Sequence, residues 1–225
     1  MQYILSLGGS IIAPSTGIDV GFLRKFRGLI LREVRAGHRF FIITGGGSTA
    51  RNYIQAAAEV NKLSSTDGDW LGIHSTRLNG HLLRTILADI AHPEIITNPL
   101  KKITSRRPVL IAAGYKPGWS TDYVATLLAK EYKIKTLLNL SNIDYVCDKD
   151  PRKFKDAKAI KTINWKDFRK IVGNKWHPGL NAPFDPVASK LAQELKLKVV
   201  ILNGRKIVNL RNCLEGGNFQ GTIIV

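Results

Sequence analysis

Residues 40–51 read FFIITGGGSTAR, an apolar run followed by three consecutive glycines and then by residues that suit a helix. The apolar run predicts a buried strand. Glycine loses more conformational freedom on folding than other residues, so three in a row need a reason. At a strand-to-helix junction they free backbone N–H groups for an anion, and the helix N-terminus adds positive potential. The stretch therefore predicts an α/β unit with a phosphate site. The alternative is a turn that needs glycine only for tight packing.

A second glycine loop, SLGGS at residues 6–10, also follows an apolar run, at residues 3–7. The presence of two such loops favours phosphate binding over packing alone. Neither loop has the Walker pattern G-x-x-x-x-G-K-[ST], and neither has the dinucleotide-binding pattern G-x-G-x-x-G. Those two routes to phosphate chemistry are therefore disfavoured.

Further apolar runs at residues 109–113, 136–140 and 199–202 predict strands, and the segments between them predict helices. Strands joined by helical crossovers form a mostly parallel sheet with helices on both faces. We therefore expect an α/β fold, a three-layer sandwich formed by one continuous domain over residues 1–225. The two halves of the chain can form two lobes. The C-terminal TIIV is expected to pair at an edge of the sheet.

Capping residues indicate where several helices begin. Asp19 and Asp185 are expected at these positions, and Pro186 suits a first helical turn. Asn164 and Asp167 can cap a short helix, and Ser120 and Thr121 stand where another helix begins. Residues 61–69 are expected to form a polar connection, and residues 71–90 an amphipathic helix. Its apolar stripe comprises Leu78, Leu82, Ile86 and Ile90, and its opposite polar face comprises His74, Arg77, His81 and Arg84.

The chain has 34 Lys and Arg against 17 Asp and Glu, a formal net charge of +17. This charge favours anionic partners such as nucleotides or acidic surfaces. Nucleic acid is disfavoured, because the sequence has no zinc-finger spacing, no aromatic RNA-binding signature and no basic tail. Two cysteines, and five histidines without close metal-ligand spacing, predict neither a disulfide framework nor a structural metal.

No apolar run approaches the roughly 18 residues of a membrane-spanning helix. The N-terminus, MQYILSLGGS, has no basic leader and no cleavage site for a signal peptide. We expect a cytoplasmic protein without a membrane partner.

Ligands of such sheets bind beyond the carboxyl ends of the strands. Four loops there are chemically unusual, at residues 8–10, 45–51, 114–122 and 141–151. In the third, Lys116, Ser120 and Thr121 suit a phosphate, although a plain N-cap also explains Ser120. In the fourth, Asp144 can orient a lysine or hold magnesium through water. Asp148 and Asp150 can hydrogen-bond a ribose, and a turn-rich surface loop is the alternative.

The motifs SLGGS, ITGGGSTAR, DWLGIHSTRLN, AAGYKPGWSTD, LSNIDYVCDKDP and NAPFDPVASK occur in order along the chain. As a set they resemble the amino-acid-kinase superfamily, and within it the uridylate (UMP) kinases of the archaeal type. The resemblance implies one sandwich around a mostly parallel eight-stranded sheet. It implies an acceptor-side lobe mainly of residues 1–135, an ATP-side lobe mainly of 136–225, and a homo-oligomer, with a hexamer favoured. The implied reaction, in pyrimidine biosynthesis, transfers the γ-phosphoryl of ATP to UMP with Mg²⁺ and gives UDP.

The resemblance also implies roles for individual residues, and it implies no protein ligand for a metal. The ATP side would comprise Gly8, Gly9, Ser10, Gly47, Arg51, Ser141, Asn142, Cys147 and Asp150. The UMP side would comprise Gly46, Asp69, Arg77, Lys116, Pro117, Gly118, Trp119, Ser120, Thr121 and Asp122. The residues implied in catalysis are Gly9, Ser10, Arg51, Lys116 and Asp144.

Four positions depart from the family pattern, and two of them lack an expected lysine. The residues are Ser6 in the first strand, Ser48 after the triple glycine, Tyr145 in place of a turn glycine, and Cys147 in place of an aromatic residue. Lys116 and Lys190 are both candidates for the lysine that neutralises the transferred phosphoryl group, and the sequence does not choose between them.

Three other functions compete with a UMP kinase. The first is a kinase for another phosphate acceptor, such as isopentenyl phosphate, which His74 permits, whereas Asp69 favours a ribose. The second is a nucleotide-binding protein with weakened catalysis, which Ser6, Ser48 and Tyr145 suggest. The third is a nucleic-acid-binding protein, which only the net charge suggests.

Overall fold

The computed structural model describes residues 1–175 and 182–225. Within these residues the main sheet has seven strands in the order β3-β2-β1-β4-β8-β9-β7. The first five strands of this order run parallel. β9 runs antiparallel to β8 and parallel to β7. The strands are β1 (Gln2–Leu7), β2 (Arg39–Thr44), β3 (Val109–Ala112), β4 (Thr136–Ser141), β7 (Thr162–Ile163), β8 (Lys198–Asn203) and β9 (Thr222–Ile224).

The sheet is mostly parallel, as predicted, but it has one strand fewer in the described residues than the resemblance implies. β5 (Val146–Cys147) and β6 (Ala159–Ile160) pair only with each other, as a separate antiparallel ribbon. The C-terminal segment forms β9, which lies between β8 and β7, so the two-residue strand β7 occupies the edge that was expected for TIIV.

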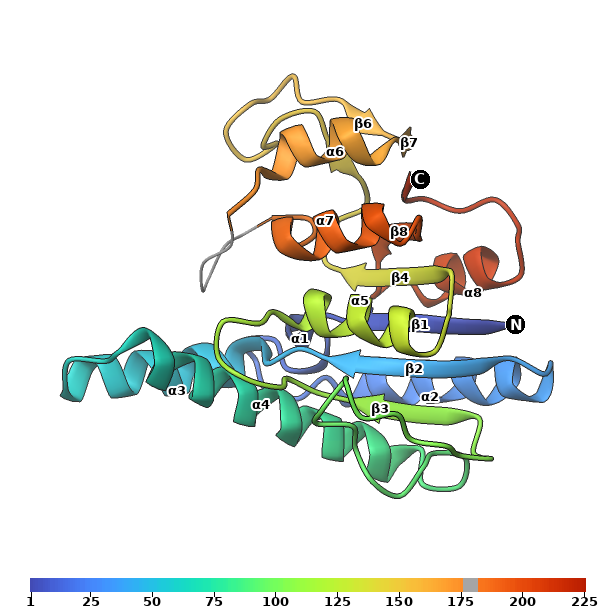
Figure 1. Cartoon of the computed structure of the whole chain (residues 1–225), viewed down its shortest axis with the longest axis horizontal. Coiled ribbons are helices and arrows are strands. Elements are labelled where there is room, and N and C mark those ends of the chain that lie inside the picture. The colour runs from blue at the N-terminus through green and yellow to red at the C-terminus, as the bar shows by residue number, and fades with distance from the viewer. Residues whose placement is uncertain (176–181) are drawn as a thin grey trace.

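Helices cover both faces of the sheet, which confirms the three-layer sandwich. α5, α6 and α7 lie in front of the strands, and α2 and α8 lie behind them (Figure 1). One core packs Phe26 of α2 and Leu210 of α8 against the sheet, and the other packs Leu128 of α5 and Phe168 of α6. The helices are α1 (Gly9–Ile12), α2 (Val20–Arg35), α3 (Gly47–Val60), α4 (Ser65–Ile86), α5 (Thr121–Glu131), α6 (Trp165–Val172), α7 (Pro186–Glu194) and α8 (Ile207–Leu214).

Four of the candidate N-caps are confirmed by hydrogen bonds from backbone N–H groups to their side chains, whereas Asp167 lies inside α6. Asp19 accepts from Phe22 at 2.8 Å, and Ser120 accepts from Tyr123 at 3.1 Å. The equivalent bonds to Asn164 and Asp185 measure 2.9 and 2.6 Å. Each cap satisfies an N–H group that the first helical turn leaves without a partner.

Two expectations about helices were wrong in part, and one helix was missed. Residues 61–69 do not form a connection throughout, because α4 already begins at Ser65. Ser64 is its N-cap and accepts a hydrogen bond from Asp67 N at 3.1 Å. Leu78 is 62% exposed and lies off the buried face, whereas Leu82, Ile86 and Ile90 of the predicted stripe are partly buried against the core. The most buried face carries Ile73 and Leu83 together with small or polar residues such as Thr76 and Gly80, which let α4 lie close to β2 and β3. α8 was not predicted.

Within the described residues, no helix is long and apolar enough to cross a membrane. Because the five central strands are parallel, their carboxyl ends share one edge of the sheet. α3 and the beginning of α4 project past this edge (Figure 1). The loops that follow β1, β2, β3, β4 and β8 therefore meet there, and we call this edge the rim.

Candidate functional site

The two glycine loops lie against each other at the rim, backbone to backbone. A Cβ added to Gly9 would lie 2.6 Å from the carbonyl oxygen of Gly45 and would overlap the backbone nitrogen of Gly47. Gly47 has a φ of +67°, and a Cβ there would lie 2.8 Å from the oxygen of Ala13. Only glycine fits these positions. Tight packing is therefore a real reason for the glycines, and their phosphate-binding role stays a prediction.

Buried hydrogen bonds hold the triple-glycine loop in place. Gly45 N donates to Leu7 O at 2.9 Å. The Ser48 hydroxyl donates to Ala13 O at 2.7 Å, and Asn79 Nδ2 donates to Gly45 O at 2.8 Å. Ser48 and Asn79 are 6% and 2% exposed. Ser48, at the position where the family resemblance implied a lysine, thus joins the two loops, whereas no sequence pattern had singled out Asn79.

Arg51 supplies a positive charge beside these loops. It lies in the second turn of α3, is exposed, and makes no hydrogen bond or ion pair with any part of the chain that the structure describes. The structure therefore brings Gly8, Gly9, Ser10, Gly46 and Gly47 together at the rim, with Arg51 one helical turn away. A free guanidinium at such a place suits phosphate oxygens.

The loop at residues 114–120 is bound to α4, as the predicted UMP side requires. Gly118 N donates to Asp69 Oδ2 at 2.7 Å, and Arg77 Nη2 donates to Tyr115 O at 3.1 Å. Gly114 N donates to the Thr76 hydroxyl at 2.7 Å. Asp69 and Arg77 thus lie beside the loop with which the sequence grouped them. In this structure both contact the loop's own backbone.

Aromatic rings support the same loop. The Nζ atom of Lys116 lies 4.5 Å from the centroid of the Trp119 ring, a cation–π contact. Trp119 packs edge-on against Tyr115 and Tyr123, with centroids 5.4 and 4.9 Å away. These contacts give Trp119 a packing role and hold Lys116 on the loop, while the predicted contact of Trp119 with UMP stays a prediction.

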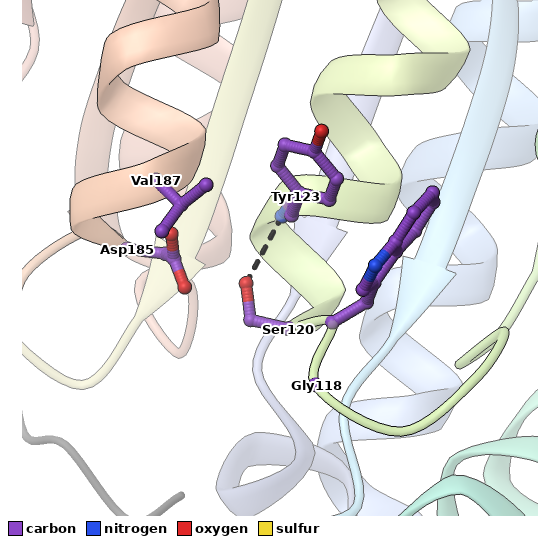
Figure 2. A pocket seen from close by; sticks show the side chains of 6 residues that line it. Gly118, Ser120, Tyr123, Asp185 and Val187 are labelled. Carbon is purple, nitrogen blue, oxygen red and sulfur yellow. Dashed lines mark hydrogen bonds between the residues drawn. The ribbon is translucent and has the colours of Figure 1, made fainter. Parts of the chain in front are cut away.

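A small pocket of about 110 Å³ opens between the beginnings of α5 and α7. Figure 2 shows Ser120 and Tyr123 on the α5 side and Asp185 and Val187 on the α7 side. The dashed line is the N-cap bond from Tyr123 N to Ser120, which confirms the capping role of Ser120. The pocket thus lies between the loop at 114–120 and the beginning of α7, which belongs to the second half of the chain.

Asp122 joins the two halves of the molecule. Its Oδ1 accepts from Ser6 Oγ at 2.9 Å and from Asn139 Nδ2 at 3.2 Å, and its Oδ2 accepts from Asp185 N at 3.2 Å. Ser6, at the position where the family resemblance implied a lysine, is 5% exposed. These contacts give Asp122 a structural role between β1, β4 and α7, while its predicted contact with UMP stays a prediction.

Burial raises the pKa of Asp122 to about 6; the Ser6 hydrogen bond lowers it, and the charge of Asp185 raises it. The ordinary value of this carboxyl is 3.8. Between these two values the folded protein holds a proton that the unfolded chain releases, so raising the pH favours unfolding. Above about pH 6 both states are ionised, and this contribution becomes constant.

We therefore expect Asp122 to lower the free energy of unfolding by up to about 3 kcal/mol between pH 4 and pH 6. Urea unfolding of the wild type and of Asp122→Asn at several pH values measures this. The stability of the variant relative to the wild type should rise with pH across the window. Asp156→Asn, which changes an exposed carboxyl, is the control. Parallel curves for Asp122→Asn and the wild type would refute the assignment.

On the predicted ATP side, Asp144 orients a lysine, which is one of its two expected roles. Its Oδ2 lies 2.9 Å from Lys206 Nζ, and its Oδ1 accepts from Asn203 Nδ2 at 3.0 Å. The Lys206 hydrogen bond holds the pKa of Asp144 below its usual range. Lys206 is neither of the two candidate lysines. Of those two, Lys116 contacts Trp119, and Lys190 is an exposed residue of α7.

Two other aspartates of this segment, Asp148 and Asp150, accept hydrogen bonds from residues close to them in the chain. Asp150 accepts two bonds from the Arg152 guanidinium, at 3.0 and 2.8 Å, and these hold its pKa well below its usual range. Asp148 accepts from Lys158 N at 2.8 Å. Ser141 ends β4, Asn142 is exposed, and Cys147 lies in β5. Across residues 1–175 and 182–225, no three His, Cys, Asp or Glu residues are placed to hold a metal.

A fifth rim loop, at residues 203–206, was not predicted. It follows β8, and Gly204 N donates to Ser141 O at 2.9 Å. The signal was the same as at the other loops, since a glycine and two basic residues in NGRK follow the apolar run VVIL. The loop carries Arg205 and Lys206 to the rim.

Comparisons with known proteins agree with this arrangement along the whole chain. The family model described as the amino acid kinase family matches residues 1–203. A uridylate kinase of Methanospirillum hungatei JF-1 is 33% identical over 224 residues, covering 98% of this chain and 93% of that protein. One of Sulfurisphaera tokodaii is 36% identical over 229 residues, covering 100% and 99%.

Among solved structures, the uridylate kinase of Archaeoglobus fulgidus superposes with a TM-score of 0.86 at 29% identity, covering 100% of both chains. The match of the family model and the identity over the full length both exceed what a shared fold alone requires. This chain belongs to the amino acid kinase family.

Proposed function

We propose that this protein is a uridylate kinase, an ATP-dependent phosphotransferase that transfers the γ-phosphoryl group of ATP to UMP and gives UDP. The observation that carries the proposal is the meeting of two glycine loops, the loop at 114–120 and the loop at 141–151 on one rim. The full-length likeness to uridylate kinases supports UMP as the acceptor.

The chemistry requires alignment and charge neutralisation rather than a protein nucleophile, because a phosphate oxygen of UMP attacks the γ-phosphorus of ATP. We assign Gly8, Gly9, Ser10 and Gly47 to the ATP phosphates, and Gly46 and Arg77 to the UMP phosphate. Arg51 supplies charge between the two nucleotides. Residues 1–135 would hold the acceptor, and residues 136–225 most of the donor, within one domain.

Mg²⁺ is proposed to arrive with ATP. The described residues form no carboxylate cage, and Asp144 is already paired with Lys206 and Asn203. Magnesium commonly keeps most of its ligands as water and substrate phosphate. When bound in this way it would offset the negative charge of the donor phosphates, while the chain's own loops orient them.

A homo-oligomer, with a hexamer favoured, is proposed for the assembly. α3 and α4 present exposed apolar side chains that suit a second copy, among them Tyr53, Val60 and Leu78, which are 63%, 88% and 62% exposed. Both cysteines are free thiols, which suits the reducing cytoplasm as the proposed location.

Turnover with a panel of acceptors tests the function. The protein is incubated with magnesium-ATP and with UMP, CMP or isopentenyl phosphate, and ADP release is followed. We expect turnover with UMP to exceed that with the other two acceptors by far. Preference for isopentenyl phosphate would replace the proposed acceptor. Binding of ATP without any turnover would instead indicate a nucleotide-binding protein that has lost catalysis.

A further inference from the structure

The rim loop at residues 203–206 contacts both loops that are proposed to hold ATP. Arg205 Nη2 donates to Ser10 O at 2.9 Å, and its Nη1 lies 3.1 Å from Asp19 Oδ2. The other oxygen of Asp19 caps α2. One side chain from the second half of the chain therefore fixes both ends of the segment between β1 and α2.

The same loop fixes the segment that follows β4. Lys206 Nζ bonds to Asp144 Oδ2 at 2.9 Å and to Gln220 Oε1 at 3.1 Å. Asn203 holds the other Asp144 oxygen. Gly204 is packed so closely that a Cβ there would lie 2.7 Å from Ile11 Cδ1 and 2.8 Å from Leu140 Cβ. The loop is thus packed tightly against α1 and β4, and its position relative to them is fixed.

The bond to Ser10 O matters because that carbonyl belongs to the first glycine loop. Ile11 N donates to Gly8 O at 2.9 Å, so the turn at residues 8–11 is fixed from inside by this bond and from outside by Arg205. Gly8 O shares a peptide plane with Gly9 N, and Ser10 O shares one with Ile11 N. The two bonds therefore fix the peptide planes on either side of the one that carries Ser10 N, and so restrict the directions of the N–H groups in this turn. The position of Ser6 in the first strand supplies no charge, whereas Arg205 places a guanidinium, 42% exposed, beside this turn.

We infer that Arg205 is a positioning residue for the donor phosphates, which acts by fixing the glycine loop at residues 8–10 from the opposite half of the molecule. The inference rests on the proposed function, because it takes this loop as the site of the ATP phosphates. Lys206 and Asn203 hold the second ATP-side loop through Asp144 in the same way. The NGRK loop is therefore a clamp on the donor side of the rim.

The test compares Arg205→Ala and Arg205→Lys with Arg27→Ala as a matched control. Arg27 also donates to one backbone carbonyl and pairs with one aspartate, Asp89, and it is 40% exposed, but it lies on α2 away from the rim. Calorimetry measures binding of the magnesium complex of a non-hydrolysable ATP analogue. Steady-state assays measure the KM values for ATP and UMP.

We expect Arg205→Ala to weaken analogue binding and to raise the KM for ATP about 10-fold, and to leave the KM for UMP unchanged. Arg205→Lys should recover part of the loss, and Arg27→Ala should bind as the wild type does. Binding by Arg205→Ala within twofold of the wild type would overturn the inference. Arg205→Gln, which keeps a donor and removes the charge, serves if Arg205→Ala does not fold.

Different results would contradict the proposed function and the proposed role of Arg205. If the wild type does not phosphorylate UMP while Arg205→Ala still loses analogue binding, the acceptor is wrong and the clamp stands. If the wild type phosphorylates UMP and the analogue binds equally to both proteins, the function stands and the clamp is wrong.

Discussion

Gly9→Ala is expected to lower the free energy of unfolding by about 3 kcal/mol or more, at the upper end of overpacking substitutions. The added methyl group would meet the backbone of Gly45 and Gly47, and a backbone cannot rotate away as a flexible side chain can. Relief would require the loops after β1 and β2 to separate. That separation would strain the bond between Gly45 N and Leu7 O and the contacts of Ser48.

Denaturant unfolding of Gly9→Ala measures this effect, and Gly28→Ala is the matched control. Gly28 lies inside α2, and a Cβ there would meet nothing within 4 Å. Alanine at that position should raise the free energy of unfolding by about 0.5–1 kcal/mol, because it removes backbone freedom from the unfolded chain. If Gly9→Ala were as stable as the wild type, the packing of the two loops would be wrong.

The fold could be predicted wherever a single local pattern determines an element. The apolar runs at 3–7, 40–44, 109–113, 136–140 and 199–202 became β1, β2, β3, β4 and β8, with small differences at their ends. The interior of each of these strands is buried, so its sequence is mostly apolar, with Ser6, Thr44 and Asn139 as buried polar exceptions. The N-caps are equally local, since Asp19 bonds to an N–H group only three residues away.

Elements that depend on distant packing were predicted poorly. α4 buries Thr76, Asn79 and Gly80 beside its apolar residues, and an apolar stripe cannot reveal the small and polar part of a buried helix face. These residues are needed because α4 lies close to Thr44 and supports the triple-glycine loop. The edge strand β7 has only two residues, too few for any periodicity.

The candidate site shows the same difference between features that follow from local sequence and features that depend on distant residues. The glycine loops, the loop at 114–122 and the loop at 141–151 could be placed together, because parallel strands bring their carboxyl ends to one edge. Pairing within the site could not be predicted. Asp144 and Lys206 are 62 positions apart, and Asp122 and Ser6 are 116 apart, so only the folded chain shows which charges meet.

Arg51→Ala is expected to reduce kcat/KM for phosphoryl transfer by about 100-fold, because a guanidinium bonded to phosphate contributes roughly 1.5–3 kcal/mol. The folded protein does not depend on this side chain. Arg51 is exposed, and it bonds to nothing within the described residues. The melting temperature should therefore stay unchanged, which separates this variant from Gly9→Ala.

Arg24→Ala is the matched control for Arg51→Ala, since Arg24 is also an exposed helical arginine but lies on α2. Its kcat/KM should equal that of the wild type. Arg51→Lys keeps the charge and loses the planar fork, so it should recover only part of the activity. Full activity of Arg51→Ala would show that the charge between the nucleotides comes from another residue, and the clamp residue Arg205 would then be the next candidate.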